Sequence, residues 1–535
     1  MTPASPVGTP LSLRAPAEHR QALCRTSDGS GWPDLASTPW TQSPCPLVDS
    51  STHAAAELVQ LAERWTRQYS SWKPSTNLPS QSPPNRSSCP PIFLSGHQPE
   101  LFHAGVWYKN FVLDNLAQST AAQPVNLLID QDLVKTNFLA VPSLTNGSYH
   151  SQRVPLDYGG VGLPFEERQV EHPDVLSSVP ERVRAVALPW VSAELLEEMW
   201  PDVVELSQEL RGLGYGYAAA RHRLEQQVGC RTLEVPLSWV CQTRSFAQFV
   251  VRILERFESF VDSYNRCLAE YRVWYGIRGN QRPMPDLAIY KSWHELPFWV
   301  WTARQPVRQR LFVQRTSDGW QLSVGRDSEV LLDTWRLDLD HQFAEEQIVG
   351  FTDLQVRLRP RALMTTLYAR GVLSQAFLHG IGGAMYDQMT DRLAKVVWDL
   401  KLPTYAIATA TMHLAHSPAN VSTDQRRNLQ RYSRDLHFAP ERIPVFAERF
   451  PQWVADKQAL LQQIPPRKQR HAWQQKVEQL LAIARRSLAP EIADVEKQLR
   501  KLDAQLHERD LMTNREWSFV LFDRNLPVEL QEMAR

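Results

Sequence analysis

The chain of 535 residues has no excess of charge of either sign, few cysteines and no long apolar run. Lysine and arginine together number 58, as do aspartate and glutamate, so the balance does not favour general attraction to nucleic acid or to a membrane surface. The six cysteines include no Cys-x-x-Cys pair, which argues against a zinc site and against a disulfide framework. No apolar run approaches the ~18–20 residues that a membrane span requires.

The N-terminus is rich in Pro, Ser and Thr and lacks the basic start and apolar core of a secretory signal. These absences predict a cytoplasmic protein with no membrane partner, no resident metal site and no nucleic-acid partner. The length is too great for one compact core and predicts about two to four units.

Composition and hydrophobic periodicity divide the chain into five segments. An arm with one helix comes first, and an α/β core interrupted by a mixed insertion follows. A region rich in charged and Gln residues, with helical spacing, ends the chain. The predicted segments are 1–90 for the arm, 91–150 and 351–416 for the two parts of the core, 151–350 for the insertion, and 417–535 for the helical region.

The most informative stretch is SGHQPELFHAG at 95–105, which follows an apolar run and precedes a helical pattern. A loop between a strand and a helix N-terminus offers free backbone N–H groups and the positive end of the helix dipole to an anion. His97 and His103 could stabilise charge on a phosphoryl group there, and Gly105 would let the backbone approach the ligand. The alternative is that a histidine near a helix start is a surface or capping residue.

Asp130 and Asp132 follow a second apolar run at 125–129. Because ligands bind at the carboxyl ends of strands in open α/β sheets, both carboxylates are expected beside the first loop. They could hold Mg²⁺, orient an amine or act as a base. The other interpretation is a strand end followed by an Asx turn.

Two further segments are candidates for a functional role. Glycines at 380, 382 and 383 precede a helical pattern and could again present N–H groups to phosphate, so Gly382 and Gly383 are candidate nucleotide-binding residues. The aromatic-rich run at 293–299 could close over a substrate as a lid, although packing is the more common role of such a cluster.

The first loop resembles that of the bacillithiol biosynthesis cysteine-adding enzyme family, whose pattern runs T-G-Q-Q-x-G-L-F-x-G-P-L-Y-x-x-x-K. The matching positions here are Gly96, Gln98, Leu101, Phe102, Gly105, Tyr108 and Lys109. Further matches are LIDQD at 128–132, LRP at 358–360, GIGGAMY at 380–386 and LQE at 530–532. The chain departs from the family pattern at His97, Gln131 and Ala384.

This resemblance implies an α/β fold with a Rossmann-like, nucleotidyltransferase-like parallel-sheet core, a large α+β insertion and a C-terminal coiled coil. It also implies a ligase that joins cysteine or another amine to a small acceptor, with ATP or another nucleotide, and Mg²⁺ where phosphate is handled. Gly96, Gln98, Gly105 and Lys109, with Gly382 and Gly383, would then bind the nucleotide. His97, His103, Asp130 and Asp132 would serve catalysis.

Two other functions stay open on the sequence alone. One is a nucleotidyltransferase-like enzyme with another small substrate. The other is a non-catalytic nucleotide-binding or assembly protein. It is favoured because Val106 stands where the similar His-x-Gly-His signature of nucleotidyltransferases has its second His, and because Gln131 stands where the cysteine-adding family has a His. A synthetase-like RNA-binding role has little support, because the net charge is zero and the basic patch RKQRH at 467–471 is only five residues long.

The C-terminal region carries an apolar seam with alternating spacings of three and four residues. Such a seam must be covered, either by the same chain or by a second copy. The family resemblance includes a pairing coiled coil and favours a homodimer through these helices. The residues of the seam are Ile492, Val495, Leu499, Leu502 and Leu506.

Overall fold

The computed structural model describes residues 11–29, 45–70, 90–279, 284–326, 329–414 and 421–535. The chain forms two compact units. Unit 1 contains residues 1–141, 152–412 and 515–535, and unit 2 contains residues 142–151 and 413–514. None of the helices in the described ranges is long and apolar enough to cross a membrane.

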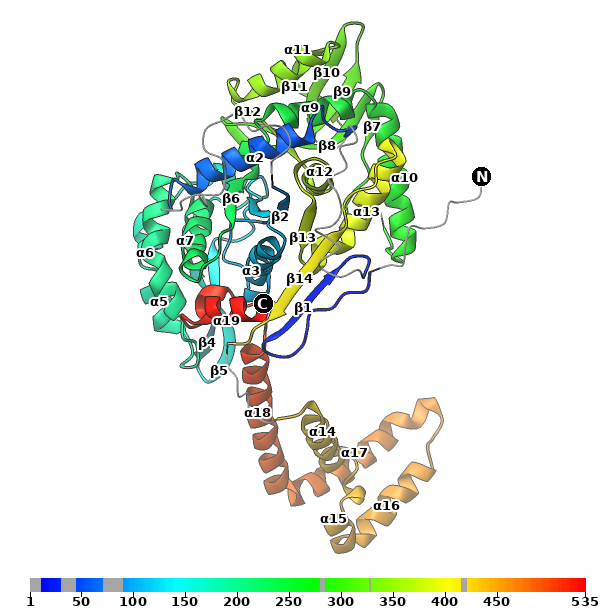
Figure 1. The fold of residues 1–535 in the computed structure, drawn as a ribbon. Coiled ribbons are helices and arrows are strands. Elements are labelled where there is room, and N and C mark those ends of the chain that lie inside the picture. Colours follow the sequence, from blue (N-terminus) through cyan, green and yellow to red (C-terminus); the bar gives the residue numbers. More distant parts are fainter. Residues whose placement is uncertain (1–10, 30–44, 71–89, 280–283, 327–328, 415–420) are drawn as a thin grey trace. The chain divides into compact units, whose positions relative to one another are not determined.

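Unit 1 is an α/β structure built on a six-stranded sheet of order β1-β14-β13-β2-β3-β6 (Figure 1). The strands β14 (Tyr405–Thr411), β13 (Ala376–His379), β2 (Ile92–His97), β3 (Gln123–Leu128) and β6 (Leu233–Pro236) are mutually parallel. Only β1 (Gln21–Thr26) runs antiparallel, beside β14. The predicted α/β class is therefore confirmed, with a mixed but mostly parallel sheet.

Burial explains why the central strands read as continuous apolar runs. Every residue of β14 is buried, as are all residues of β2 except Gly96, because helices pack on the sheet. The helix α3 (Ala104–Ser119) contacts β2 and β14, while α2 (Ser51–Thr66) packs on β6. The helix α13 (Ile381–Trp398) packs on α12 (Ala362–Tyr368) and α10 (Phe257–Trp274).

The strand order has one functional consequence. From β2 the chain adds β3 and then β6 on one side, whereas β13 and β14 lie on the other side of β2. The order therefore reverses between β2 and β13, which are direct neighbours in register, with Leu378 opposite Ser95. Open parallel sheets bind ligands at such a switch point, outside the carboxyl ends of the strands.

A second, antiparallel sheet has the order β11-β10-β9-β8-β12, with β7 (Ile289–Tyr290) paired to β8. Its strands are β8 (Trp293–Thr302), β9 (Gln305–Arg315), β10 (Gly319–Arg326), β11 (Glu329–Asp338) and β12 (Val356–Pro360). The aromatic run at 293–299 is thus part of β8. The lid interpretation of this run was wrong, because Trp293, Leu296 and Phe298 are buried in a paired strand.

Two segments outside the predicted core contribute to the main sheet. β1 comes from the N-terminal segment that we expected to be an arm with one helix, and β6 comes from the segment 151–350 that we expected to be an insertion. Before β6 the chain also forms α6 (Glu194–Glu209), α7 (Leu213–Gln227) and the hairpin of β4 (Phe138–Thr145) and β5 (Ser148–Pro155). Residues 152–412 accordingly belong to one compact unit.

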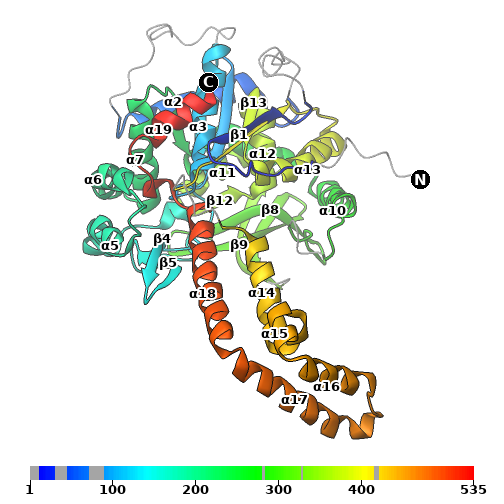
Figure 2. The ribbon, with the colours of Figure 1, turned by 90° about the horizontal axis from the view of Figure 1, so that it is seen from below.

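Unit 2 is helical in residues 421–514, as the charge-rich composition predicts. Its helices are α14 (Thr423–Phe438), α15 (Pro444–Arg449), α16 (Pro451–Gln462), α17 (Arg470–Ser487) and α18 (Ala489–Met512). Figure 2 shows α16 and α17 side by side, and α14 also packs on α18. After α18 the chain returns to unit 1, where α19 (Leu526–Ala534) packs on α3.

Candidate functional site

A cavity of about 240 Å³ opens where β2, β3 and β13 end. Its wall combines segments that are far apart in the sequence, all of them in unit 1. They are the end of β2, the turn after β3, the start of α12, the end of β13 and the first two turns of α13. Of the residues expected to form a site, the cavity is lined by Gly96, His97, Gln98, Asp132 and Gly383.

His97 is buried, and both nitrogens of its ring have partners. The Asn126 amide nitrogen donates to Glu234 Oε1 at 2.8 Å and also lies 3.3 Å from His97 Nε2. Because that amide group is a donor, Nε2 must be the acceptor, which leaves the ring proton on Nδ1, 3.1 Å from the Gln98 carbonyl oxygen. Burial, followed by the nearby charges of Arg221 and Lys109, holds the pKa of His97 well below its ordinary value. The lowered pKa favours the neutral ring over the cation with which we expected His97 to stabilise a phosphoryl group.

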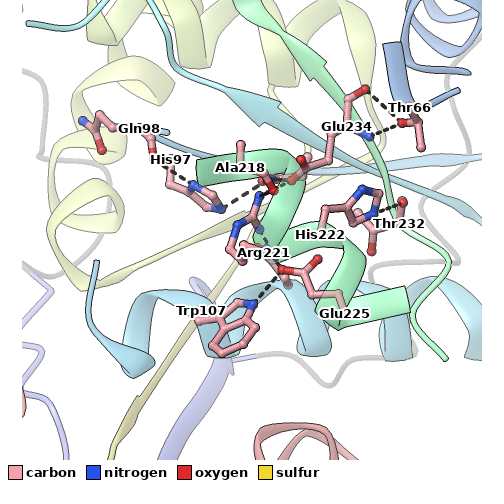
Figure 3. A network of polar contacts seen from close by, with 12 residues as sticks. Thr66, His97, Gln98, Trp107, Ala218, Arg221, His222, Glu225, Thr232 and Glu234 are labelled. Carbon is pink, nitrogen blue, oxygen red and sulfur yellow. Dashed lines mark hydrogen bonds and ion pairs between the residues drawn. The ribbon is translucent and has the colours of Figure 1, made fainter. Parts of the chain in front are cut away.

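Behind His97 lies a network of buried charges (Figure 3). The Arg221 guanidinium on α7 forms ion pairs with Glu225 on the same helix and with Glu234 on β6. All three side chains are at most 1% exposed. Two carboxylates face one guanidinium. Two neutral donors also stabilise the charge of Glu225: Trp107 Nε1 at 2.7 Å and Asn110 Nδ2 at 2.8 Å both donate to Glu225 Oε1. Such a network fixes the positions of its members, including Asn126 and hence the ring of His97.

The two aspartates after β3 have different environments. Asp130 is fully buried and accepts hydrogen bonds from the backbone N–H of Ser238 at 3.0 Å, from the Ser238 hydroxyl and from the Tyr215 hydroxyl at 2.8 Å. It does not line the cavity, and burial raises its pKa. The structure thus places Asp130 away from the cavity where we expected it: its carboxylate joins the turn after β3 to α8 (Leu237–Val240).

Asp132, by contrast, lines the cavity. Its carboxylate accepts a hydrogen bond from Gln98 Nε2 at 2.7 Å and from Arg308 Nη1 at 3.1 Å, and its side chain is 37% exposed. Beside it the Gln131 side chain is 3% exposed and its Oε1 has no hydrogen-bond partner. The cavity thus presents a carboxylate held in place by two donors and a buried amide oxygen that a ligand could satisfy.

His103 and Gly105 lie away from the cavity. His103 is the N-cap of α3, where its Nδ1 accepts a hydrogen bond from the Gly105 N–H at 3.1 Å. Its Nε2 is 3.6 Å from Glu516. A Cβ atom on Gly105 would lie 2.2 Å from the Ala410 carbonyl oxygen, so this glycine permits close approach to β14 rather than to a ligand. The capping interpretation of His103 fits the structure, and the phosphate-stabilising one does not.

Lys109 and Gly382 are near the cavity without lining it. Lys109 Nζ donates to the Gly96 carbonyl oxygen at 3.0 Å, so this cation supports the loop after β2 from behind. Burial, followed by repulsion from Arg221, lowers the pKa of Lys109 to about 8. Gly382 faces open space on the side where a side chain would project.

The end of β13 supplies a pair that we did not predict. His379 Nε2 lies 2.7 Å from Asp387 Oδ2, which also accepts a hydrogen bond from Arg370 Nη1 at 2.7 Å. His379 and Asp387 both line the cavity, although each is nearly fully buried. Burial lowers the pKa of His379 in spite of its carboxylate partner. The only sequence signal was that a histidine stands directly before the glycines at 380, 382 and 383.

The helix α13 begins beside this pair. Its N-cap is Gly380, which offers no side-chain cap to the N–H groups of the first turn. A Cβ atom on Gly383 would lie 2.7 Å from His379 Nδ1, so only glycine lets the helix start approach the imidazole ring this closely. A neutral base, a helix N-terminus and a carboxylate therefore face one cavity. This set can bind an anion and accept a proton.

Arginine and tryptophan side chains complete the wall. The Arg361 guanidinium lies 4.1 Å from the centre of the Trp299 ring and forms an ion pair with Glu295 at 2.7 Å. Both Arg361 and Trp299 line the cavity, and Trp299 comes from β8. Within the described parts of the chain, no three His, Cys, Asp or Glu side chains gather closely enough to hold a metal ion.

Comparison with known proteins adds no family to these observations. Neither a protein-family model nor a curated protein matches this chain.

Proposed function

We propose that this chain is an enzyme that uses a nucleotide to join an amino acid or another amine to a small acceptor. The observation that supports this function is the position of the cavity at the switch point between β2 and β13. The resemblance of the first loop to the bacillithiol cysteine-adding family points to the same chemistry on a Rossmann-like core. The particular substrate of that family enters this proposal only through the resemblance.

In this proposal the phosphates of ATP or a related nucleotide lie at the N-terminus of α13. The N–H groups at the start of that helix are not capped by a side chain, and the helix dipole favours an anion there. The Arg361 side chain, which also lines the cavity, adds positive charge. Mg²⁺ would enter with the nucleotide, since Mg²⁺ is usually held by one or two carboxylates together with substrate phosphates, and Asp132 is the accessible carboxylate.

The same wall supplies the proton chemistry that an amine requires. An amine attacks only when it has lost its proton, so the reaction needs a base that is neutral before the step. The lowered pKa of His379 supplies such a base at neutral pH, and Asp387 orients its ring through Nε2. Asp132 would hold the substrate ammonium before the proton is removed.

The rival function is a protein that binds a nucleotide without catalysing a reaction. The environment of His97, whose two ring nitrogens both have partners in the chain, favours this rival over an enzyme that uses His97. It does not weigh against an enzyme that uses His379. The two functions differ in turnover and not in binding.

Calorimetric titration with ATP is the first test, and we expect a dissociation constant between micromolar and millimolar. Gly383→Val should abolish the heat, because the added side chain would occupy the space between the helix start and His379. Lys395→Gln, an exposed position later on α13, is the matched control and should bind as the wild type does. Absence of heat with every nucleoside triphosphate, well above the millimolar range, would refute the proposal.

Turnover is the second test. Release of phosphate or pyrophosphate from bound nucleotide is measured with a panel of amino acids and small amines. An amine that stimulates release, and becomes attached to an acceptor in a mass-spectrometric assay, identifies the enzyme. Tight binding with no release in the presence of any amine would support the non-catalytic rival.

A further inference from the structure

A second cavity, of about 260 Å³, lies elsewhere in unit 1 and shares no lining residue with the first. Its walls come from the loop at 100–102, residues 134–140 at the start of β4, the beginning of α7 and residues 516–518. Polar and apolar groups share the wall about equally, and Phe138, Phe165 and Trp517 are among its large side chains. This volume is just below the roughly 300–1,000 Å³ that is usual for small-molecule sites, so the cavity suits a small ligand.

A buried cation stands in this wall. Arg168 is 3% exposed, and its Nε and Nη2 atoms are enclosed without a hydrogen-bond partner. Its closest carboxylate is Asp157, with Nη2 3.8 Å from Oδ2, which is too long for a hydrogen bond. Buried guanidinium groups normally make several hydrogen bonds, because an unpaired buried charge is costly.

Asp157 lies within ion-pair distance of Arg168 but leaves its N–H groups without a hydrogen bond, because the oxygens of Asp157 already have other donors. Oδ1 accepts from the backbone N–H groups of Tyr158 at 2.8 Å and His172 at 2.9 Å. Oδ2 accepts from the backbone N–H of Glu171 at 2.9 Å. The carboxylate thus organises the loop at 157–172, and the guanidinium of Arg168 keeps unsatisfied N–H groups.

We propose that this cavity binds a small monocarboxylate with an aromatic or branched apolar body. The carboxylate would take hydrogen bonds from Arg168, and the body would lie against the aromatic wall. The Tyr217 hydroxyl is a second donor, since it lines the cavity, is buried and has no hydrogen-bond partner. The proposal does not depend on the function proposed for the first cavity.

The remaining charges of the wall restrict the ligand further. Glu100 and Glu516 also line the cavity. Two carboxylates in the same wall as one guanidinium disfavour phosphate or a dicarboxylate, whose extra negative charge would be repelled. They allow a ligand that carries an ammonium group beside its carboxylate, so the ligand is either a simple acid or a free amino acid with an apolar side chain.

The test titrates the full-length protein with 3-phenylpropionate, with its neutral amide and with L-phenylalanine. We expect the acid to bind at least tenfold more tightly than the amide, because only the acid is charged. Arg168→Gln should reduce binding of the acid at least tenfold, and Tyr217→Phe should reduce it to a smaller extent. Arg304→Gln, at the exposed turn between β8 and β9, is the matched control.

Two further measurements make the result decisive. The melting temperature of Arg168→Gln checks that the variant is folded, so that a loss of binding reports on the cavity and not on unfolding. If L-phenylalanine binds more tightly than the simple acid, an amino acid is the ligand; the reverse order identifies a simple acid. The proposal would be overturned if acid and amide bound equally, or if neither substitution changed binding. It would also be overturned if neither carboxylate bound at tens of millimolar.

Discussion

His379 Nε2 and Asp387 Oδ2 lie 2.7 Å apart, although one residue ends a strand and the other lies in the second turn of the following helix. Arg370 donates to the same carboxylate oxygen and thereby keeps Asp387 ionised: the pKa of Asp387 is well below its ordinary range because Arg370 and His379 both favour the charged form against burial. The imidazole is consequently oriented by a carboxylate while it stays neutral, which is the arrangement of a general base.

If the proposed reaction takes place, His379→Gln should lower the turnover number by about two to four orders of magnitude, the usual contribution of a general base. Turnover of the wild type should fall as the pH drops through a value below 6.5, because the pKa of His379 is lowered from that value. It should be flat between there and neutral pH. Steady-state rates of both proteins between about pH 4.5 and 8 provide the measurement, and an unchanged rate for His379→Gln would exclude this residue as the base.

The glycines at the starts of α3 and α13 should respond in opposite ways to alanine. A Cβ atom on Gly105 would lie 2.2 Å from a backbone oxygen of β14, which cannot move without displacing the strand, so Gly105→Ala should cost about 3 kcal/mol or more. Gly382→Ala meets open space in a helix and should stabilise the protein by about 0.5–1 kcal/mol. Urea denaturation of the two variants checks this, and equal effects would contradict the close approach of α3 to β14.

Much of the main sheet could be predicted from the sequence, because β2, β3 and β14 are buried on both faces and read as apolar runs. Three strands escaped prediction for physical reasons. β6 and β13 are only four residues long, too short for a periodic signal, and β1 is an edge strand whose residues are mostly exposed. These segments form strands because they pair with β3 or β14, and that pairing depends on the tertiary fold and not on the local sequence.

The candidate site was predicted in part for a similar reason. Polar residues that directly follow apolar runs marked the carboxyl ends of β2 and β3, and the fold does bring His97 and Asp132 to one cavity. Position could not reveal that Asp130 turns into the core to meet Tyr215 and Ser238, since those partners are distant in the sequence. The relation of His379 to Asp387 likewise depends on how α13 folds back beside β13.

The network in Figure 3 predicts that Arg221 is essential for stability. Arg221→Met would leave Glu225 and Glu234 buried without their cation, and breaking a buried ion pair typically costs about 3–5 kcal/mol. Arg223 on the same helix pairs with Asp202 at 2.7 Å, but both side chains are about one-third exposed. Arg223→Met should therefore cost only about 1 kcal/mol. Denaturant midpoints measure both, and similar losses would contradict the role given to burial.

His97 predicts a dependence of stability on pH. Its folded pKa is well below the ordinary 6.5, so below pH 6.5 the unfolded chain takes up a proton that the folded protein does not. Stability conferred by the neutral ring is thus complete above pH 6.5 and is lost as the pH falls toward the folded pKa, by up to about 1.4 kcal/mol per pH unit. In His97→Gln, the side chain at position 97 takes up no proton in either the folded or the unfolded state. The free energy of unfolding should therefore fall less steeply in the variant as the pH drops below 6.5, and identical slopes would show that His97 is not held neutral.

The apolar seam of α18 is covered within its own chain. Val495 is buried in a cluster with Leu436 of α14 and Leu488, and Ile492 and Leu499 pack against that cluster. Val495→Glu would bury a charge there and should unfold unit 2, seen as a loss of helical signal in a thermal melt. The molar mass of the wild type should not depend on this seam.

A homodimer would instead need apolar residues that unit 2 leaves exposed. Ile483 on α17 and Ile464 after α16 are each 58% exposed, and Val445 on α15 is 75% exposed. We expect light scattering to give twice the chain mass of 61.4 kDa for the wild type. Ile483→Glu should shift the mass to that of one chain with little change in melting temperature, because an exposed position tolerates charge within the monomer. A wild type with the mass of a single chain would exclude the dimer, and a dimer that persists in Ile483→Glu would place the pairing surface away from α17.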